Sequence, residues 1–467
     1  MPDKKLFPGK FVAPLYLGNS FNPINTTLLT TALVPIAHFM NISVAQVTIL
    51  VTVLYLACTV AQPTAGKLSE VLGPRRVFLS GIIILFLGGL VGGIGQNLTM
   101  LILSRVLIGI GTSTAYPSSM LIIRQRAESG GLSEPPGSVL GSLQIAALIT
   151  SIIGLPIGGA LVQYVGWRMT FFINIPFALV AFIMTILWIP RDIHADGAKS
   201  FAQIFSSIDG TGIIGFAGTM ISLLIFLFSL PHFVWIPLAL TVIFGAVSIV
   251  WELRVKRPFI DVRLLAKNMA ITRTYIRFAA LTLCSYAILY GLTEWMQAAK
   301  GISSSNAGLL MLPMVIVSTV VVLLLSRRNM VRGSLFIAAG FAIAASVCAL
   351  FLSTASSVIF IVIITVLFGV TMGSMIIGNQ AAIYKLSTAD QLGTASGLFR
   401  TAGYIGSIAS TAIISIVFQK NVSDSGLNVI SVIMLAVSVL AMLLTVTDRW
   451  VMGYSKSANA NKGGNVK

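Results

Sequence analysis

The chain has 467 residues, of which 56% are hydrophobic and 9% are charged, and its formal net charge is +17. Because a soluble domain carries roughly 25% charged residues, this composition excludes a soluble globular fold and indicates lipid as the surrounding solvent. The basic residues lie in short loops, which argues against a nucleic-acid partner. The three cysteines lie in apolar runs, which argues against a disulfide framework.

Apolar runs fill most of the sequence, and a bilayer span needs roughly 20 mostly apolar residues. Fourteen runs qualify: 11–37, 46–65, 77–96, 99–122, 138–164, 168–189, 210–230, 232–252, 272–297, 305–326, 332–353, 357–380, 392–419 and 426–447. They predict an all-α integral membrane protein with 14 transmembrane helices, built as two six-helix bundles plus two extra helices.

The longest polar stretches flank the two extra helices and suggest the division of the chain. We predict a cytoplasmic N-terminus (1–10), an N-terminal bundle (11–189), cytoplasmic linkers with the two extra helices (190–271), a C-terminal bundle (272–447) and a disordered cytoplasmic tail (448–467).

The distribution of Lys and Arg predicts the orientation, because cytoplasmic loops carry an excess of both. With both termini inside, the inner segments hold all but six of the 30 basic residues. The six are Arg168, Lys300 and Lys420 in outer loops and Arg105, Arg277 and Arg400 within spans.

The connection after the second predicted helix reads GKLSEVLGPRRVFLSG, residues 66–81. Gly66 and Gly73 predict tight turns at the membrane face. Glu70 is an acid in a loop that also carries two adjacent arginines, Arg75 and Arg76. An ordinary positive-inside loop is the alternative interpretation.

Two further spans carry residues that a membrane helix rarely holds without a reason. Arg105 lies in the fourth, and a guanidinium in hydrocarbon usually pairs or faces a polar cavity. The run at 154–176 reads GLPIGGALVQYVGWRMTFFINIP, in which Pro156 removes a donor from the helix. Three of its glycines permit close packing between helices: Gly154, Gly158 and Gly159.

Glu294 lies near the outer end of the predicted helix 272–297, in an otherwise apolar run. One interpretation is an interfacial acid beside Trp295 in an aromatic belt. The other is a carboxyl that lines a cavity and binds a proton or a cationic substrate.

These motifs resemble those of the major facilitator superfamily, and in particular of its fourteen-helix drug:proton antiporters. Residues 66–81 are similar to the signature loop after the second helix, Arg105 to the fourth-helix motif, and 154–176 to the antiporter motif. Residues 397–406, GLFRTAGYIG, are similar to another motif of that branch and contain Arg400.

The resemblance implies a secondary transporter that works by alternating access. It implies a cytoplasmic gate formed by Gly66, Glu70, Gly73, Arg75, Arg76 and Arg400, with Glu70 close to a helix that starts near Leu392. It also implies roles in proton coupling or substrate binding for Glu294, Arg105 and Asn25. Asn25 stands where that branch often has an acid, and Asn does not take up a proton.

We therefore expect a proton-coupled exporter of amphipathic or cationic compounds, such as drugs, that is a monomer in the plasma membrane. We expect no enzymatic activity, cofactor or metal. Three alternatives stay open at this point: an exporter of a lipid or metabolite, an uncoupled facilitator, and a membrane-embedded enzyme. The last is disfavoured because no histidine lies near an acid within a span.

The charge distribution makes a testable prediction about orientation. Single cysteines that replace Ser129 and Ser303, in a background without native thiols, should react with impermeant reagents from opposite sides of the membrane. Cysteine labelling of intact cells and of inverted vesicles measures this. Labelling of both positions from the same side would contradict the fourteen-helix orientation.

Overall fold

The structure is a computed structural model that describes residues 6–42, 47, 49–132, 134–192, 201–230, 233–256, 258–302, 304–328, 330–388, 390–419 and 421–453. Within these residues the chain is helical, with one π-helix and no strand. Each of the fourteen ranges that the sequence predicted overlaps a helix of the structure.

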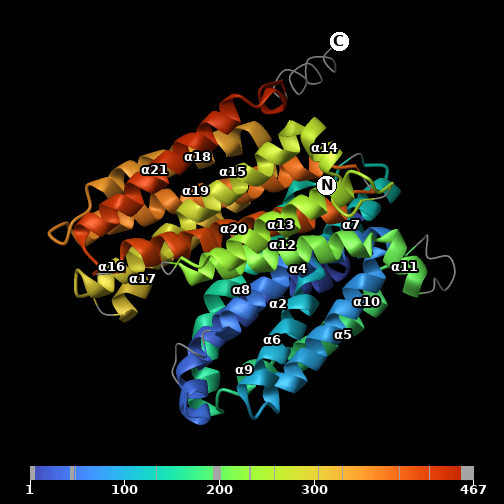
Figure 1. Cartoon of the computed structure of the whole chain (residues 1–467), viewed down its shortest axis with the longest axis horizontal. Helices are drawn as coiled ribbons and strands as arrows, with labels where there is room; N and C mark the ends of the chain where they lie inside the picture. The colour runs from blue at the N-terminus through green and yellow to red at the C-terminus, as the bar shows by residue number, and fades with distance from the viewer. Residues whose placement is uncertain are drawn as a thin grey trace. The chain divides into compact units, whose positions relative to one another are not determined.

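The chain divides into two compact units, of which unit 1 consists of Met1–Ile221, Phe244–Asp261 and Ser387–Thr401. Its helices are α2 (Gly9–Met40), α4 (Ile49–Leu72), α5 (Pro74–Gly93), α6 (Leu98–Ser113), α7 (Ala115–Ser129), α8 (Gly137–Tyr164), α9 (Met169–Phe172), α10 (Asn174–Trp188) and α11 (Phe201–Ser207). Within this unit α2 packs against α8 and α10, and α5 packs against α6 and α10 (Figure 1).

Unit 2 consists of Ser222–Ile243, Val262–Leu386 and Ala402–Lys467. Its helices are α14 (Val262–Lys267), α15 (Met269–Tyr286), η1 (Ala287–Leu292), α16 (Thr293–Ala298), α17 (Ser304–Arg328), α18 (Val331–Leu350), α19 (Val358–Leu386) and α21 (Asp424–Val446). Here α19 packs against α17 and α18, and α21 packs against α15 and α18. The division between the units passes through α12 (Gly210–Ser229), α13 (Trp235–Glu252) and α20 (Leu392–Val417).

In the described part of the chain, twelve helical segments are long and apolar enough to cross a membrane. Three of the twelve combine neighbouring elements: α6 with α7, α9 with α10, and α15 with η1 and α16. The two long helices α2 and α8 are not among the twelve. That fourteen helices cross the membrane therefore remains a prediction. The predicted division into domains remains a prediction as well.

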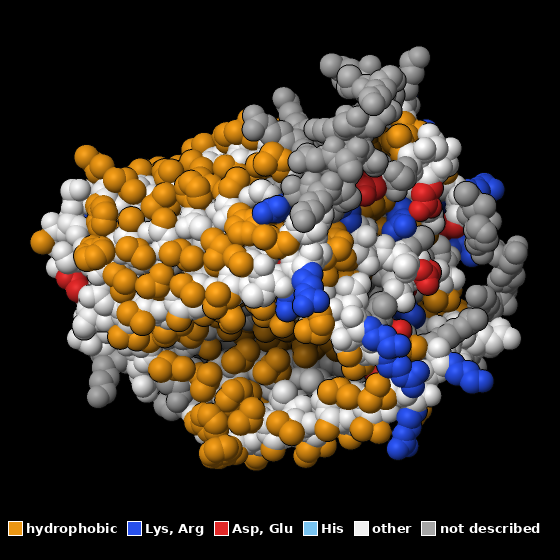
Figure 2. Space-filling model, turned by 90° about the horizontal axis from the view of Figure 1, so that it is seen from above, with side chains coloured by type: hydrophobic (Ala, Val, Ile, Leu, Met, Phe, Trp, Pro, Cys, Tyr) orange, Lys and Arg blue, Asp and Glu red, His pale blue; other side chains and the backbone are white. Residues whose placement is uncertain are grey.

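Exposed apolar side chains cover much of the protein surface. In α13, for example, Trp235 is 72% and Ile236 is 71% exposed. On the face shown in Figure 2 most exposed side chains are hydrophobic, and Lys and Arg gather in one region. A surface of this kind requires an apolar solvent, which agrees with the composition.

The predicted tail 448–467 begins with structured residues. Asp448 is buried, and its Oδ1 accepts the backbone N–H groups of Trp450 at 3.1 Å and of Val451 at 3.4 Å. Residues 449–453 are helical, and residues 454–467 lie outside the described residues.

Candidate functional site

Glu70 binds the first turn of α20 within unit 1. Its Oε1 accepts the backbone N–H of Thr394 at 2.7 Å, and its Oε2 accepts the Thr394 hydroxyl at 3.0 Å. The first N–H groups of a helix have no intrahelical partner, and the helix dipole favours an anion there. The structure thus places Glu70 at the start of the helix that begins at Leu392, while its role in a gate stays a prediction.

Glycines let α4 and the start of α20 approach each other through their backbones. A Cβ built on Gly66 would lie 2.2 Å from the carbonyl oxygen of Gly393, and one on Gly397 would lie 2.4 Å from the Cα of Pro63. Our prediction that Gly66 forms a turn is wrong, because α4 continues to Leu72. Gly66 is needed for close approach instead.

Gly73 does form the predicted turn, with φ of +97°, a value that favours glycine. The next residues begin α5, and their backbone N–H groups meet a carboxylate that the sequence analysis did not single out. Asp192 Oδ1 accepts the N–H of Arg75, and its Oδ2 accepts the N–H of Arg76, both at 3.1 Å. The side chain of Arg75 donates to the carbonyl oxygen of Ile186 at 3.1 Å.

Arg400 also belongs to the part of α20 in unit 1. Its NH2 donates to Gln144 Oε1 at 3.1 Å, and its guanidinium carbon lies 4.0 Å from the centre of the Tyr116 ring. An amide and an aromatic face thus hold this cation, and Glu70 lies in the same unit, where it binds the preceding turn of α20.

The structure brings Arg105 and Asn25 together in the interior of unit 1. Both are fully buried, and Arg105 NH1 donates to the backbone carbonyl of Asn25 at 3.4 Å. The guanidinium carbon lies 4.3 Å from the centre of the Phe171 ring. The amides of Asn25 and Asn174 donate to each other at 2.7 and 3.0 Å. Arg105 therefore avoids lipid, and dipoles and an aromatic face surround its charge.

Two of the three antiporter-motif glycines face α2. A Cβ on Gly154 would lie 2.0 Å from Thr27 Oγ1, and one on Gly158 would lie 2.7 Å from Thr31 Oγ1. A Cβ on Gly159 would meet nothing within 4 Å. Pro156 lies within α8, and its side chain is outside the described part of the structure.

Glu294 is exposed and lines an open cavity of about 510 Å³ at the surface of unit 2, where all the lining residues belong to η1 and α16. The lining residues are Leu289, Tyr290, Thr293, Glu294, Gln297 and Ala298, and none of them is basic. The π-helix η1 directly precedes α16, whose second residue is Glu294. Such π-turns occur mostly as local bulges in α-helices and often lie at functional sites. No pattern in the sequence predicted this π-helix.

Trp295, next to Glu294, is fully buried, and its Nε1 donates to Asp424 Oδ1 at 2.9 Å. The same carboxylate accepts the backbone N–H of Thr354 at 3.0 Å. The placement of Trp295 in an aromatic belt is therefore wrong, because this side chain faces the interior of unit 2. The two neighbours point in different directions: Trp295 fixes the helix, and Glu294 faces the cavity.

Two buried acids at the ends of the extra helices were not predicted from the sequence. Asp209 has a φ of +56°; its Oδ1 accepts Trp251 Nε1 at 2.9 Å, and its Oδ2 accepts the N–H of Phe259 at 3.1 Å. Glu252 Oε1 accepts the N–H of Ile260 at 3.3 Å. The Asp-Gly pair before the predicted helix 210–230 was the available signal for a cap.

Arg277, a basic residue within a predicted span for which no role was predicted, is buried in unit 2. Arg277 Nε donates to Asn379 Oδ1 at 2.9 Å, and its NH2 donates to Thr274 Oγ1 at 3.1 Å. Its NH1 lies 3.8 Å from Asp448 Oδ2, which makes this a buried ion pair. Among the described residues, no group of three His, Cys, Asp or Glu side chains could hold a metal ion.

A helical chain with many candidate spans, an apolar surface and charges held in its interior is a polytopic membrane protein. The chain belongs to the Major Facilitator Superfamily, whose family profile matches residues 15–411. It is thus a member of a family of membrane transporters and not of enzymes.

Relatives and solved structures agree with this assignment. The uncharacterized MFS-type transporter YwoD of Bacillus subtilis (strain 168) is 31% identical over 448 residues, covering 93% of this chain and 96% of YwoD. The tetracenomycin C resistance and export protein of Streptomyces glaucescens is 25% identical, over 86% of this chain and 74% of that protein. The crystal structure of the human organic anion transporter MFSD10 has a TM-score of 0.65 at 14% identity, over 93% of this chain and 99% of that one. That last similarity concerns the fold.

Glu70→Ala should free the start of α20 from unit 1, because hydrogen bonds to a charged group contribute about 1.5–3 kcal/mol each. A single cysteine in place of the buried Ser396, without native thiols, reports the release. It should react at least tenfold faster with a thiol reagent in the Glu70→Ala protein, and transport should fall. Glu70→Gln, which can still accept a hydrogen bond, is the control with an intermediate effect. Equal reaction rates in all three proteins would contradict the prediction.

Arg105→Lys keeps the charge but loses the planar group that lies over Phe171. It should lower stability in detergent by about 2 kcal/mol, as expected for a desolvated cation–π contact, and it should impair transport. Phe171→Leu, which keeps an apolar side chain, should cause a similar loss of stability. Thermal denaturation and transport rates measure both effects. Wild-type stability and transport in Arg105→Lys would show that the geometry of the guanidinium is unimportant.

Proposed function

We propose that this transporter is a proton-coupled exporter of amphipathic, cationic compounds, and that Glu294 binds either the proton or the cation. The observation that carries the proposal is the cavity of about 510 Å³ on which Glu294 is exposed. Among the lining residues Glu294 is the only Asp, Glu, Lys, Arg or His, so the only formal charge that the lining can carry from such a residue is negative.

The chemistry of the lining supports a cationic ligand. Tyr290 contributes an aromatic ring, and aromatic faces attract cations. Leu289 and Ala298 contribute apolar surface, and Thr293 and Gln297 contribute polar groups. A protonated Glu294 would lose its attraction for a cation, so that proton and substrate would compete for one carboxyl. Such competition is what exchange of a cation for protons requires.

The proposal includes fourteen membrane spans with both termini in the cytoplasm. The lengths of the two helices outside the twelve candidates support it, since α2 has 32 residues and α8 has 28. At 1.5 Å per residue they are about 48 and 42 Å long, whereas a hydrocarbon core is about 30 Å thick.

We further propose that the protein acts as a monomer in the plasma membrane of its cell. The bacterial relatives YwoD and the tetracenomycin C export protein support that location, and the latter supports export of an antibiotic as the direction of transport. The contact of Glu70 with the start of α20 supports a gate, because the contact holds residues 387–401 on unit 1.

Glu294→Gln keeps the size and hydrogen bonding of the side chain but removes its charge. In vesicles with an imposed pH gradient, it should abolish the export of a fluorescent amphipathic cation while the protein remains in the membrane. Glu294→Asp should retain part of the activity. The matched control is Glu128→Gln, which removes an exposed acid that pairs with Arg124 at 2.8 Å and should transport as the wild type does.

Three outcomes would count against the proposal. Wild-type export by Glu294→Gln would reduce Glu294 to an interfacial acid. Export by the wild-type protein that is insensitive to the pH gradient would indicate an uncoupled facilitator. Failure of the cation to be exported by any variant, with export of a neutral metabolite or lipid instead, would exclude the substrate class.

A further inference from the structure

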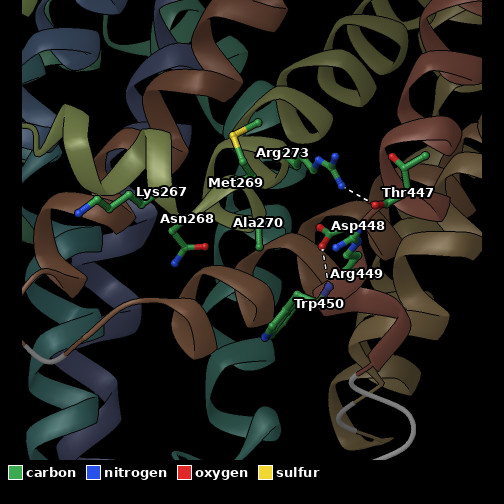
Figure 3. A pocket seen from close by; sticks show the side chains of 9 residues that line it. All are labelled: Lys267, Asn268, Met269, Ala270, Arg273, Thr447, Asp448, Arg449 and Trp450. Carbon is green, nitrogen blue, oxygen red and sulfur yellow. Dashed lines mark hydrogen bonds between the residues drawn. The ribbon is translucent and has the colours of Figure 1, made fainter.

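Unit 2 has a second cavity, of about 440 Å³, whose lining residues are distant from Glu294 in the sequence. It is lined by Lys267, Asn268, Met269, Ala270, Arg273, Thr447, Asp448, Arg449 and Trp450. These residues come from two places: the end of α14 with the start of α15, and the segment that follows α21. Figure 3 shows Asn268 and Ala270 on one side of the cavity and Asp448 and Arg449 on the other, with Arg273 directed toward Thr447.

The cavity is positively charged. Three of its lining residues are basic, namely Lys267, Arg273 and Arg449, and one is acidic. The acid, Asp448, is already bound: its Oδ1 accepts two backbone N–H groups, and its Oδ2 faces the buried Arg277. It therefore cannot neutralise the three cations.

The start of α15 adds to the attraction for an anion. Asn268 caps the helix, because its Oδ1 accepts the backbone N–H of Ile271 at 3.4 Å. Met269 and Ala270, the first two residues of α15, also line the cavity. The first N–H groups of a helix have no intrahelical acceptor, and phosphate groups bind at such positions. Arg273 NH1 donates to the carbonyl oxygen of Thr447 at 2.5 Å, which fixes this guanidinium at the edge of the cavity.

The position of the cavity favours a lipid as the source of the phosphate. Met269 is the first residue of one candidate span and Val446 is the last of another. All lining residues lie within a few positions of these two ends, which is the level of lipid headgroups. Basic pockets at this level suit phospholipid headgroups, and Trp450 is a residue type that anchors proteins at the interface.

We propose that this cavity binds the phosphate group of an anionic phospholipid. Arg449 and Arg273 contact the phosphate, the start of α15 faces its oxygens, and Lys267 increases the local positive potential. The bound lipid connects the start of α15 with the segment after α21. The assignment is independent of the transported substrate and of Glu294.

Retention of lipid by the purified full-length protein tests the proposal, with phosphatidylglycerol, phosphatidylcholine and inorganic phosphate as probes. Native mass spectrometry should show bound phosphatidylglycerol, and its apparent affinity should fall about tenfold or more in Lys267→Gln/Arg449→Gln, because each cation near a membrane surface contributes measurably to anionic lipid binding. The matched control, Arg254→Gln/Lys256→Gln, removes two exposed cations elsewhere and should bind as the wild type does. Arg449→Lys should retain most of the binding.

Other outcomes would overturn the proposal. Equal retention of phosphatidylglycerol by the two double variants would show that the cavity is not the site. Equal retention of phosphatidylcholine and phosphatidylglycerol by the wild type would show that the anionic headgroup is not recognised. If inorganic phosphate stabilised the protein against heat as much as phosphatidylglycerol does, the bound phosphate group would not have to come from a lipid, and the proposal would be wrong. An unchanged size-exclusion profile shows that a variant is folded.

Discussion

Hydrocarbon offers no water to a buried polar group, so each backbone N–H at a bend or helix start needs a partner within the chain. The chain meets this need with few acids, 13 against 30 basic residues. Asp192, Asp209, Asp424 and Asp448 each accept backbone N–H groups at a turn or helix start. Each of these four carboxylates therefore stabilises one particular turn or helix start. The positions of the adjoining helices depend on these hydrogen bonds.

Arg277 and Arg105, both fully buried, show different ways of keeping a cation away from lipid. Arg277 has a carboxylate, since Asp448 Oδ2 lies 3.8 Å from its NH1. Arg105 is held by the carbonyl of Asn25 and the ring of Phe171, without an ion pair among the described residues. Burial of an unpaired charge is costly, so at Arg105 a carbonyl dipole and an aromatic face must offset a cost that the ion pair reduces at Arg277.

Hydrophobic run length was enough to predict the helices, because spans are set by bilayer thickness and by little else. The resemblance to a known family, and not run length, predicted that Glu70 lies close to the start of α20. Run length and motif alike left other features undetermined. Neither could predict that Gly66 lies inside α4, because a glycine that serves close approach and one that serves a turn look alike in sequence. Asp209 and Asp192 escaped notice because the backbone groups that they bind, at Phe259 and at Arg75 and Arg76, are distant in the sequence. The insertion of η1 before Glu294 depends on tertiary packing, which no periodicity records.

That π-helix has a geometric consequence for the residues that follow it. An α-helix turns by about 100° per residue, and a π-turn accommodates one additional residue relative to α-helical winding. Conversion of Ala287–Leu292 to α-helical hydrogen bonding would therefore rotate Glu294 and Trp295 by roughly 100° about the helix axis. Such a rotation would pull the Trp295 indole away from Asp424 and change the direction in which the carboxyl points. The hydrogen bond of the buried Trp295 indole to Asp424 thus opposes this rotation and keeps the Glu294 side chain in its present direction.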